Sequence, residues 1–597
     1  MKKKRRKVFD VIRKNIYMLS IVKKASKWFI LFSIIISITA LVDTFSNTWF
    51  SKIVFDSMEN RSSFSFLLLS IIVLFVFMTI SAIVKNVFYK KYYPKENQTI
   101  SGYIHSLVFN KIHELDLIYF ENTDFYNKYT RALTEADERA MSLLNTISEL
   151  SYSIVTLLTL FSIIVYLDPI LLAFAVSGAI LSALISKKLS VIRYKYNFDK
   201  TQYDRKISYI NRIFYEPQYS KDLKIGALHL YFVKFYSEIV KNITNYIKNR
   251  TNKIAFWEFI SGIQNIVLQI LMTIFLTWRV YNDVISIGDY AALLNSTFAL
   301  MFQLQSFSSL IPKFYEHSLY IDNFKEIMDI QPNIEQNQGI ELRPDEPLLI
   351  EFKNVGFSYP NSARVVLNNI NLTFFSGKKH AIVGHNGAGK STIIKLILRL
   401  YDVTFGEILI NGINIKNYNV YSLRKNIATI FQDFQIYSIP ISDYIMSSKF
   451  EEKSDEEMLQ YAIRNVGLEE KINSLSNGIQ TVLSKEFDEN GAVLSGGENQ
   501  KLAMAKAIAQ NANTFIMDEP SSALDPISEY ELNQNMIKIA KGKTVILISH
   551  RLSTTKDADL IYYIENGSVK ESGDHDKLIK MNGKYAKMFN MQAESYL

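Results

Sequence analysis

Six long apolar stretches in the first half of the chain constrain its fold more than any other feature. Each is long enough to cross a bilayer core of roughly 30 Å, which takes about 20 helical residues. Residues 64–84 include no charged residue, and a soluble core helix is rarely apolar on every face over such a length. Only Asp168 separates the third stretch from the fourth, so we expect a tight hairpin there. The predicted spans are residues 28–50, 64–84, 150–167, 169–186, 254–278 and 290–312.

Basic residues near the ends of the spans predict their orientation. The first 27 residues carry eleven Lys or Arg against one acid, and the positive-inside rule then places the N-terminus in the cytoplasm. The basic run at residues 2–7 resembles a nuclear import signal, but a topology determinant or a contact with anionic lipid explains it better beside a span. The N-terminus lacks a signal-peptide cleavage pattern. An even number of spans returns the second half of the chain to the cytoplasm.

Two long hydrophilic loops, residues 85–149 and 187–253, are expected inside the cell as helices that extend beyond the membrane. Each loop contains a break rich in aromatic and polar residues, at residues 116–126 and 215–222. We interpret these breaks as docking points for a cytoplasmic domain; the alternative is a plain helical turn.

Polar side chains inside the predicted spans allow two interpretations. They line a translocation pathway, or they are satisfied without such a role, by hydrogen bonds between helices or by a place in a watery extension of the span, because an unpaired polar group is costly in the membrane. Asp43 is the first to mutate, since the span around it is otherwise apolar. The residues concerned are Asp43, Glu258, Gln264, Asn265, Gln269, Asn295, Gln303 and Gln305.

The sequence changes character near residue 340, from apolar runs to alternating polar and apolar segments with Gly-rich turns. We therefore predict a basic N-terminus at residues 1–27, a membrane domain at 28–330, a linker at 331–347 and a second domain at 348–597. The chain has no cysteine, which excludes disulfides, thiolate metal sites and a cysteine nucleophile. Its richness in Ile, Lys, Asn, Tyr and Phe suggests an AT-rich bacterial genome.

A glycine-rich turn in the second domain is typical of a phosphate-binding loop. It follows a predicted buried strand at residues 379–384 and precedes a predicted helix at 391–400, the context that such a loop requires. Its glycines let the backbone curl around phosphate oxygens, and the N–H groups at the helix start attract the anion. Lys390 is expected on the β- and γ-phosphates and the Ser391 hydroxyl on Mg²⁺. The loop consists of Gly384, His385, Asn386, Gly387, Ala388, Gly389, Lys390, Ser391 and Thr392.

Two further predicted strands bring acid and histidine side chains to the same edge. Residues 514–517 end in Asp518, which can hold Mg²⁺ through water, and in Glu519, which can orient or deprotonate an attacking water. The strand at 544–549 delivers His550, which we expect at the γ-phosphate. These positions predict hydrolysis of Mg²⁺-bound ATP in an α/β domain.

The order of these motifs resembles the ATP-binding cassette transporters. Ser495, Gly496 and Gly497 precede Asp518 and Glu519, and a segment with Ser522, Ala523, Leu524 and Asp525 follows. The spans ahead of the cassette resemble the exporter type, so the resemblance implies a multi-domain membrane protein with a six-helix all-α transmembrane domain and an α/β P-loop nucleotide-binding domain.

The resemblance also implies further site residues. Tyr359 would stack on adenine, with a plain strand aromatic as the alternative. Gln432 would ligate Mg²⁺ and link it and the attacking water to the membrane domain. Asp525 would face the other subunit, and Glu486 would lie near the intracellular loops. The signature segment departs from the commonest pattern at Glu498, where Gln is more usual, and at residues 499–501, where a more basic run is usual; these departures bear on rate and nucleotide affinity.

The signature segment Leu494, Ser495, Gly496, Gly497, Glu498 precedes a helix, so its N–H groups form a second anion site. In the family this site completes the nucleotide pocket of a second cassette. We therefore expect a homodimer, with a heterodimer with an unlike partner as the alternative. We expect it in the bacterial plasma membrane, in contact with membrane lipid. The expected mechanism is alternating access driven by ATP. No nucleic-acid partner is expected.

The transported substrate is predicted less sharply. Residues 119–126 and 485–491 resemble a bacterial branch linked to export of modified and antimicrobial peptides. Related exporters that trim a leader use a cysteine peptidase domain, and a chain without cysteine cannot, so the peptide would arrive mature or be cut elsewhere. The alternatives are a hydrophobic drug or lipid exporter and, remotely, an ATP-gated channel or sensor. The predicted spans exclude a soluble ATPase, such as a DNA-repair protein with an ATP-binding cassette.

Overall fold

The structure is a computed structural model that describes residues 2–594, except 217–218, 335–337, 344–347, 361, 363, 449–452, 520–541 and 550–554. It divides into two compact units, which are described separately. The first consists of Met1–His113 and Asn127–Ile330. The second consists of Glu114–Tyr126 and Gln331–Leu597, so a short piece of the predicted first cytoplasmic loop belongs to the second unit.

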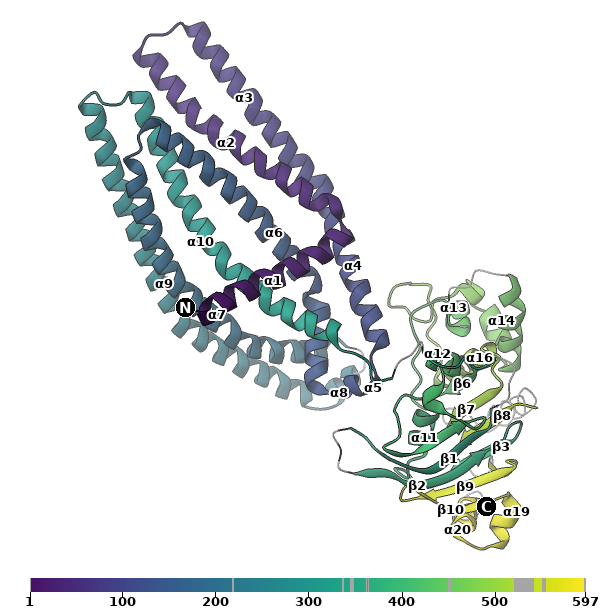
Figure 1. The fold of residues 1–597 in the computed structure, drawn as a ribbon. Coiled ribbons are helices and arrows are strands. Elements are labelled where there is room, and N and C mark those ends of the chain that lie inside the picture. Colours follow the sequence, from purple (N-terminus) through teal and green to yellow (C-terminus); the bar gives the residue numbers. More distant parts are fainter. Residues whose placement is uncertain are drawn as a thin grey trace. The chain divides into compact units, whose positions relative to one another are not determined.

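Long helices that run alongside one another build the first unit (Figure 1). Each predicted span falls on one of six of these helices; the fourth span starts two residues before its helix. A break predicted at residues 116–126 contains the short α5, Leu117–Phe120. The helices are α1 (Lys2–Ala25), α2 (Lys27–Glu59), α3 (Phe64–Val87), a π-helical turn (Phe88–Tyr92), α4 (Tyr93–Glu114), α6 (Thr123–Leu167), α7 (Leu171–Tyr215), α8 (Ser220–Ile225), α9 (Leu228–Tyr281) and α10 (Ile287–Asp329).

Within the part of the chain that the structure describes, four helical stretches are long and apolar enough to cross a membrane. They are Lys27–Glu59, Phe64–Glu114, Met141–Leu167 and Leu228–Tyr281. Leu171–Ser186 is a shorter apolar helix, and the span at 290–312 lies on α10 without meeting the same criterion. A multi-pass membrane domain follows from these helices, while the count of six spans stays a prediction.

The predicted hairpin between the third and fourth spans has a clear physical basis. Asp168 lies between α6 and α7, and its side chain is fully buried. One carboxylate oxygen accepts from the backbone N–H of Ile170 at 3.1 Å, and the other pairs with the Arg279 guanidinium of α9 at 2.8 Å. A buried carboxylate needs such partners, because desolvation without them is costly. Asp168 therefore ties the turn to a third helix.

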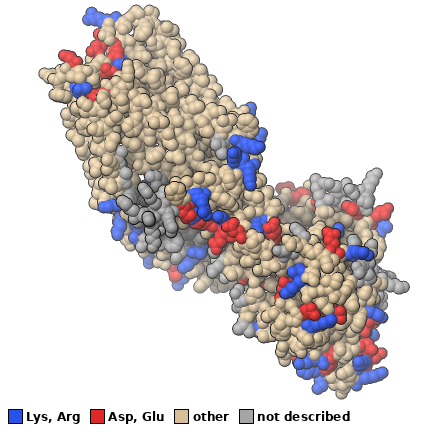
Figure 2. Space-filling model, viewed as in Figure 1, with Lys and Arg blue, Asp and Glu red and all other residues tan. Residues whose placement is uncertain are grey.

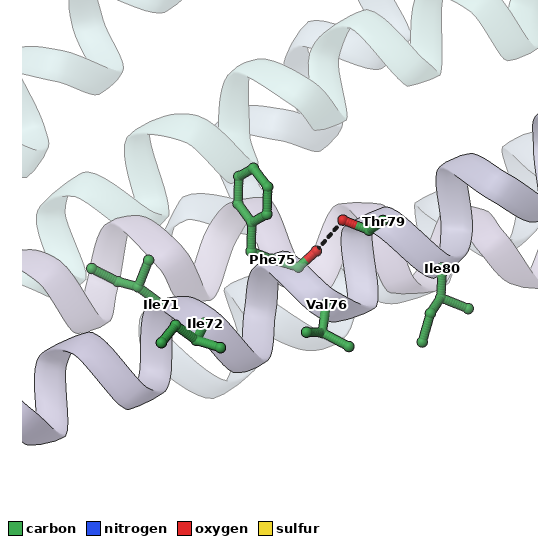
Figure 3. A pocket seen from close by; sticks show the side chains of 6 residues that line it. All are labelled: Ile71, Ile72, Phe75, Val76, Thr79 and Ile80. Carbon is green, nitrogen blue, oxygen red and sulfur yellow. Dashed lines mark hydrogen bonds between the residues drawn. The ribbon is translucent and has the colours of Figure 1, made fainter.

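Charge is distributed over the first unit as a membrane requires. On the face that Figure 2 shows, Lys, Arg, Asp and Glu gather near the ends of the helices and leave a broad belt without charged side chains. Helix α3 contributes an outer surface of exposed apolar side chains; Figure 3 shows Ile72, Val76 and Ile80 along one face of it. The Thr79 hydroxyl donates to the Phe75 carbonyl of the same helix at 2.8 Å, so this polar group is satisfied within the helix.

Most polar residues of the predicted spans make contacts between helices. Gln264 donates to the Gly178 carbonyl and to Ser182, and Gln303 donates to Ser153 at 2.6 Å. The alternative of interhelical hydrogen bonding thus describes these two side chains. The other pairs are Asn265 with Gln305, Asn295 with Ser51, Glu258 with Arg193, and Asp43 with both Ser81 and Lys85. Gln269 instead lines a hollow beside Thr273 and Phe298.

Two sheets form the frame of the second unit. The strands β1 (Ile350–Ser358), β2 (Val365–Phe374), β4 (Phe405–Ile410) and β5 (Ile413–Asn414) pair antiparallel in the order β2-β1-β4-β5. The other sheet has the order β10-β9-β3-β8-β7-β6, and only β10 runs antiparallel to its neighbour. Its strands are β3 (Lys379–Val383), β6 (Ile427–Ile430), β7 (Thr514–Asp518), β8 (Thr544–Ile548), β9 (Leu560–Glu565) and β10 (Ser568–Gly573).

Helices cover this parallel sheet because its strands are apolar on both faces, as buried parallel strands are. One hydrophobic core joins the antiparallel sheet to β3, β7, β8 and α11, and a second lies among β6, β7 and the helices α13 to α16. Besides α5, the α-helices among the described residues of this unit are α11 (Lys390–Ile397), α12 (Val420–Lys425), α13 (Ile441–Met446), α14 (Lys453–Asn465), α15 (Glu469–Asn473), α16 (Gly496–Ala509), α19 (His575–Lys580) and α20 (Lys584–Glu594).

Candidate nucleotide-binding site

The glycine-rich turn lies between the end of β3 at Val383 and the start of α11 at Lys390. Gly389, the N-cap of α11, has a φ of 103°, in the left-handed region that favours glycine. A Cβ at this position would lie 2.5 Å from the Leu367 side chain. The turn is therefore built for glycine, and it leaves the first N–H groups of α11 free to meet an anion, as in other phosphate-binding loops.

Lys390 is held inside this turn. Its ammonium donates to the carbonyls of Gly384 at 2.9 Å and His385 at 3.1 Å, and its side chain is buried. Burial lowers the pKa of Lys390, while the nearby carboxylates of Glu519 and Asp518 oppose that shift. An incoming triphosphate offers this desolvated ammonium better acceptors than two neutral carbonyls, since hydrogen bonds between charged groups are about twice as strong as neutral ones.

Two pairs of oxygen-bearing side chains meet at the carboxyl ends of the strands. The Ser391 hydroxyl donates to the buried Asp518 carboxylate at the end of β7. Burial raises the pKa of Asp518, and the bond from Ser391 opposes that shift. The Gln432 amide donates to the Glu519 carboxylate at 2.8 Å. Hydroxyl, carboxylate and amide oxygens are the ligands that Mg²⁺ takes, and few protein ligands suffice because it keeps waters and substrate phosphates. These residues fit Mg²⁺.

Glu519 has an unusual backbone. Its φ is 51°, in the left-handed region where a non-glycine residue is strained, and its N–H donates to the Ile548 carbonyl of β8 at 3.0 Å. Gln500 of α16 donates to the Glu519 carbonyl at 3.4 Å. The chain turns sharply after β7 and holds this carboxylate beside Gln432. The direct bond between the two side chains was not expected from the sequence, because nothing in the chain order pairs them.

The signature segment forms the start of α16. Ser495 is its N-cap, and the Ser495 hydroxyl accepts from the Glu498 N–H at 3.3 Å. The Glu498 carboxylate accepts in return from the Ser495 N–H at 2.8 Å, which completes a capping box. Ser495 and Gly496 are exposed, and Gly497 and Glu498 are half-buried. The Ser-x-x-Glu spacing is the sequence signal of a capping box, although we did not predict the box from the sequence.

Some predicted site residues are not placed by these contacts. His550 and the segment with Asp525 lie outside the described residues. Glu486 is exposed and accepts from the Ser438 hydroxyl at 3.4 Å, and its place near the intracellular loops stays a prediction.

Comparison with known proteins decides the family. The family model described as "ABC transporter" matches residues 367–522. The subtilin transport ATP-binding protein SpaT of Bacillus subtilis is 30% identical over 512 residues, which cover 85% of this chain and 82% of that protein. The chain belongs to the ABC transporter family. It therefore binds ATP, couples ATP hydrolysis to export, and carries its ATP-binding domain on the cytoplasmic side of a multi-pass membrane domain.

Other matches agree with this assignment. The ATP-dependent lipid A-core flippase of Haemophilus influenzae (strain 86-028NP) is 34% identical over 360 residues, 60% of either chain. The same-named flippase of Pasteurella multocida (strain Pm70) is 33% identical over 61% of this chain and 63% of its own. These alignments span less than two thirds of the flippases. A solved bacterial Atm1-family ABC exporter with ATP bound shares the fold, with a TM-score of 0.75, 20% identity and coverage of 96% and 99% of the two chains.

Tyr359 of this ABC transporter follows β1 and lies beside the phosphate loop. Its hydroxyl shares a hydrogen bond of 3.1 Å with Thr392 of α11. Its ring packs edge-on against Phe357 and Tyr401, and the Lys395 ammonium lies 5.3 Å from the ring centroid. The ring is half-buried, so stacking of adenine on Tyr359 stays a prediction.

The break predicted at residues 116–126 contacts this aromatic group. The Tyr401 hydroxyl donates to the Glu121 carboxylate at 2.7 Å, and burial together with this bond raises the pKa of Tyr401. The Asp116 carboxylate accepts from the backbone N–H groups of Asn333 and Ile334, and Leu117 packs against the hydrophobic core. The first break is thus docked on the cassette as predicted. Docking of the second, at residues 215–222, stays a prediction.

Tyr401→Phe is expected to weaken the link between ATP binding and the membrane domain, because it removes the hydroxyl that reaches Glu121 and keeps the ring beside Tyr359. All four tryptophans lie before residue 331, so tryptophan fluorescence, excited apart from that of tyrosine, reports the membrane domain alone. Two concentrations are compared: the ATP concentration that gives half of the tryptophan fluorescence change, and the mant-ATP concentration that gives half-maximal binding. We expect the ratio of the first to the second to rise at least about fivefold, the lower end of typical coupling factors.

Tyr418→Phe is the matched control for this experiment. Tyr418 lies buried in the same core and its hydroxyl donates to the Ile410 carbonyl at 2.9 Å, within the cassette. The control should shift neither curve. Equal shifts of the binding and fluorescence curves in Tyr401→Phe would show a role in the nucleotide pocket alone and contradict the prediction.

Proposed function

We propose that this ABC transporter exports a mature peptide, modified and antimicrobial peptides included, from the cytoplasm across a bacterial plasma membrane. The observation that carries the proposal is the relative named for subtilin transport, which aligns over 82% of its length. The flippases align over 60% and 63% of theirs. The resemblance of residues 119–126 to a bacterial branch of exporters linked to peptide export supports the same substrate class.

We propose further that two identical chains form the working unit. One chain has one phosphate loop and one signature segment, and Ser495 and Gly496 of that segment are exposed. In the pair, the signature segment of one copy meets the triphosphate on Lys390 of the other. Because the motif residues are all intact, two copies form two competent sites. Asp525 and His550 are assigned to the facing subunit and to the γ-phosphate on the sequence motifs alone.

The chemistry that we propose is in-line hydrolysis of ATP. Lys390 holds the β- and γ-phosphates, and Glu519 accepts a hydrogen bond from the attacking water. The water oxygen bonds to the γ-phosphorus as the bond to the β–γ bridging oxygen breaks, the water proton passes to Glu519, and ADP and phosphate leave. Ser391, Asp518 and Gln432 would hold Mg²⁺. When bound, Mg²⁺ neutralises charge on the β- and γ-oxygens.

ATP binding would perform the mechanical step in alternating access. Pairing of the cassettes moves residues 114–126 through the contacts of Asp116 and Glu121, and the membrane domain opens outward. Hydrolysis then separates the cassettes and resets the cycle.

Extrusion of a lipid or hydrophobic drug is the second candidate. The flippase relatives favour it, and so does the exposed apolar face of α3, over which acyl chains could enter from the bilayer.

Uptake into inside-out vesicles that contain the full chain tests the substrate class. A labelled mature modified peptide, the same peptide with its leader, a hydrophobic dye and a fluorescent lipid are each offered with ATP. We expect accumulation of the mature peptide and not of the leader-bearing form. Vesicles with Glu519→Gln are the control for ATP-driven transport. Accumulation of the lipid or the dye without the peptide would contradict peptide export and support the second candidate.

A further inference from the structure

The start of α16 carries a second layer of interactions beyond the capping box. The second carboxylate oxygen of Glu498 pairs with the Lys471 ammonium of α15 at 3.1 Å. Glu498 therefore binds the Ser495 N–H with one oxygen and Lys471 with the other. Lys471 lies 27 positions before Glu498 in the sequence, outside every motif considered above.

This arrangement solves an electrostatic problem. A capping box forms equally well with Gln or Glu at its third helical position, so the box alone does not require the charge. A carboxylate beside an expected phosphate site would repel a triphosphate, since like charges a few Å apart are unfavourable. Burial opposes ionisation of Glu498, but the Ser495 bonds and Lys471 outweigh it and lower the pKa of Glu498. The carboxylate is thus charged at neutral pH and needs a cation.

The pair is too exposed to act mainly through stability. The Lys471 and Glu498 side chains are 41% and 26% exposed, and ion pairs at such positions contribute little to folding. The Ser495 hydroxyl is part of the same box: it accepts from the Glu498 N–H, and its hydrogen bond to the Glu498 carboxylate helps to lower the pKa of that carboxyl. Lys471 therefore acts by neutralising the Glu498 carboxylate rather than by stabilising the fold.

We propose that Lys471 is a positioning residue of the signature segment, which neutralises Glu498 so that the Ser495 end of α16 can accept the triphosphate bound to a second copy of this chain. This inference rests on the proposed pairing of two cassettes. It assigns Lys471 no contact with the nucleotide, because it acts through Glu498.

A double-mutant cycle on the full chain in nanodiscs, with MgATP as the only ligand, tests the inference. Lys471→Met leaves Glu498 uncompensated and should raise KM for ATP about fivefold, the ratio that corresponds to the roughly 1 kcal/mol between two unit charges at 4 Å in water. Glu498→Gln should lower KM, because Lys471 is then uncompensated. The double variant should return KM close to wild type. The effect of Lys471→Met should shrink at about 1 M salt, where screening acts within roughly 3 Å.

Arg464→Met is the matched charge control. Arg464 of α14 pairs at 3.3 Å with Glu469, the first residue of α15, rather than with a residue of the signature segment, and its removal should not change KM. If the double variant kept the raised KM of Lys471→Met, or if Lys471→Met left KM unchanged, the inference would be wrong.

Ser495→Ala separates this inference from the pairing on which it rests. Loss of turnover in Ser495→Ala with no effect of the charge variants would overturn the role of Lys471 alone. Normal turnover in Ser495→Ala, with mant-ATP binding intact, would overturn the proposed pairing itself.

Discussion

Glu519→Gln should slow ATP turnover by about 10² to 10⁴-fold, the range that general-base catalysis supplies, and still bind ATP. The carboxylate lies after β7, held by the Gln432 amide at 2.8 Å, in a strained backbone that fixes its direction. A Gln at this position keeps an amide oxygen that Gln432 can reach, so the local structure survives. It cannot accept the proton of the attacking water, and the chemical step is lost.

Phosphate release from the purified full chain, measured beside equilibrium binding of mant-ATP, checks this prediction. Glu407→Gln is the matched control, because that carboxylate lies on β4 of the antiparallel sheet, where it accepts from Asn414. Wild-type turnover in Glu519→Gln would remove Glu519 from its proposed role. Loss of mant-ATP binding as well would assign it to binding rather than to the chemical step.

Lys390→Ala is expected to weaken ATP binding by about 10- to 100-fold, because hydrogen bonds to charged groups contribute roughly 1.5–3 kcal/mol. The ammonium is already buried in the phosphate loop, so its desolvation has taken place before ATP arrives. We expect bonds to the triphosphate to replace its bonds to the Gly384 and His385 carbonyls. Truncation removes those bonds and leaves the phosphate charge uncompensated.

Titration with mant-ATP measures this loss. Lys378→Ala is the control, since Lys378 precedes β3 and is exposed at its ion pair with Asp559. An unchanged affinity in Lys390→Ala, with a native circular dichroism spectrum, would contradict the assignment of Lys390 to the phosphates.

Local sequence patterns were sufficient for the phosphate loop and for three strands of the parallel sheet, β3, β7 and β8. The predicted strand at 379–384 is β3, and the predicted helix after the loop begins one residue early, at Lys390, and ends three residues early, at Ile397. Both depend on short-range signals, an apolar run and a glycine turn, which the chain order contains. For the same reason, the Asp168 turn between two apolar runs was predictable.

Contacts between distant positions were not predictable in this way. The Tyr401–Glu121 hydrogen bond joins residues 280 positions apart, and the local sequence around either residue gives no signal of its partner. Lys471 likewise gives no signal of its partner Glu498. The partners of the polar residues in the spans were not predictable either. The sequence around Gln303 or Gln264 is the same whether the side chain faces a pathway or a neighbouring helix.

The central claim is that two copies of this chain hydrolyse ATP together and thereby move a membrane domain. Light scattering and ATP turnover, measured on the same chromatographic fractions of the purified full chain, test it most directly. We expect turnover to follow the dimer mass across the peak and to fall when dilution separates the copies. Full-speed hydrolysis by strictly monomeric protein would contradict the account.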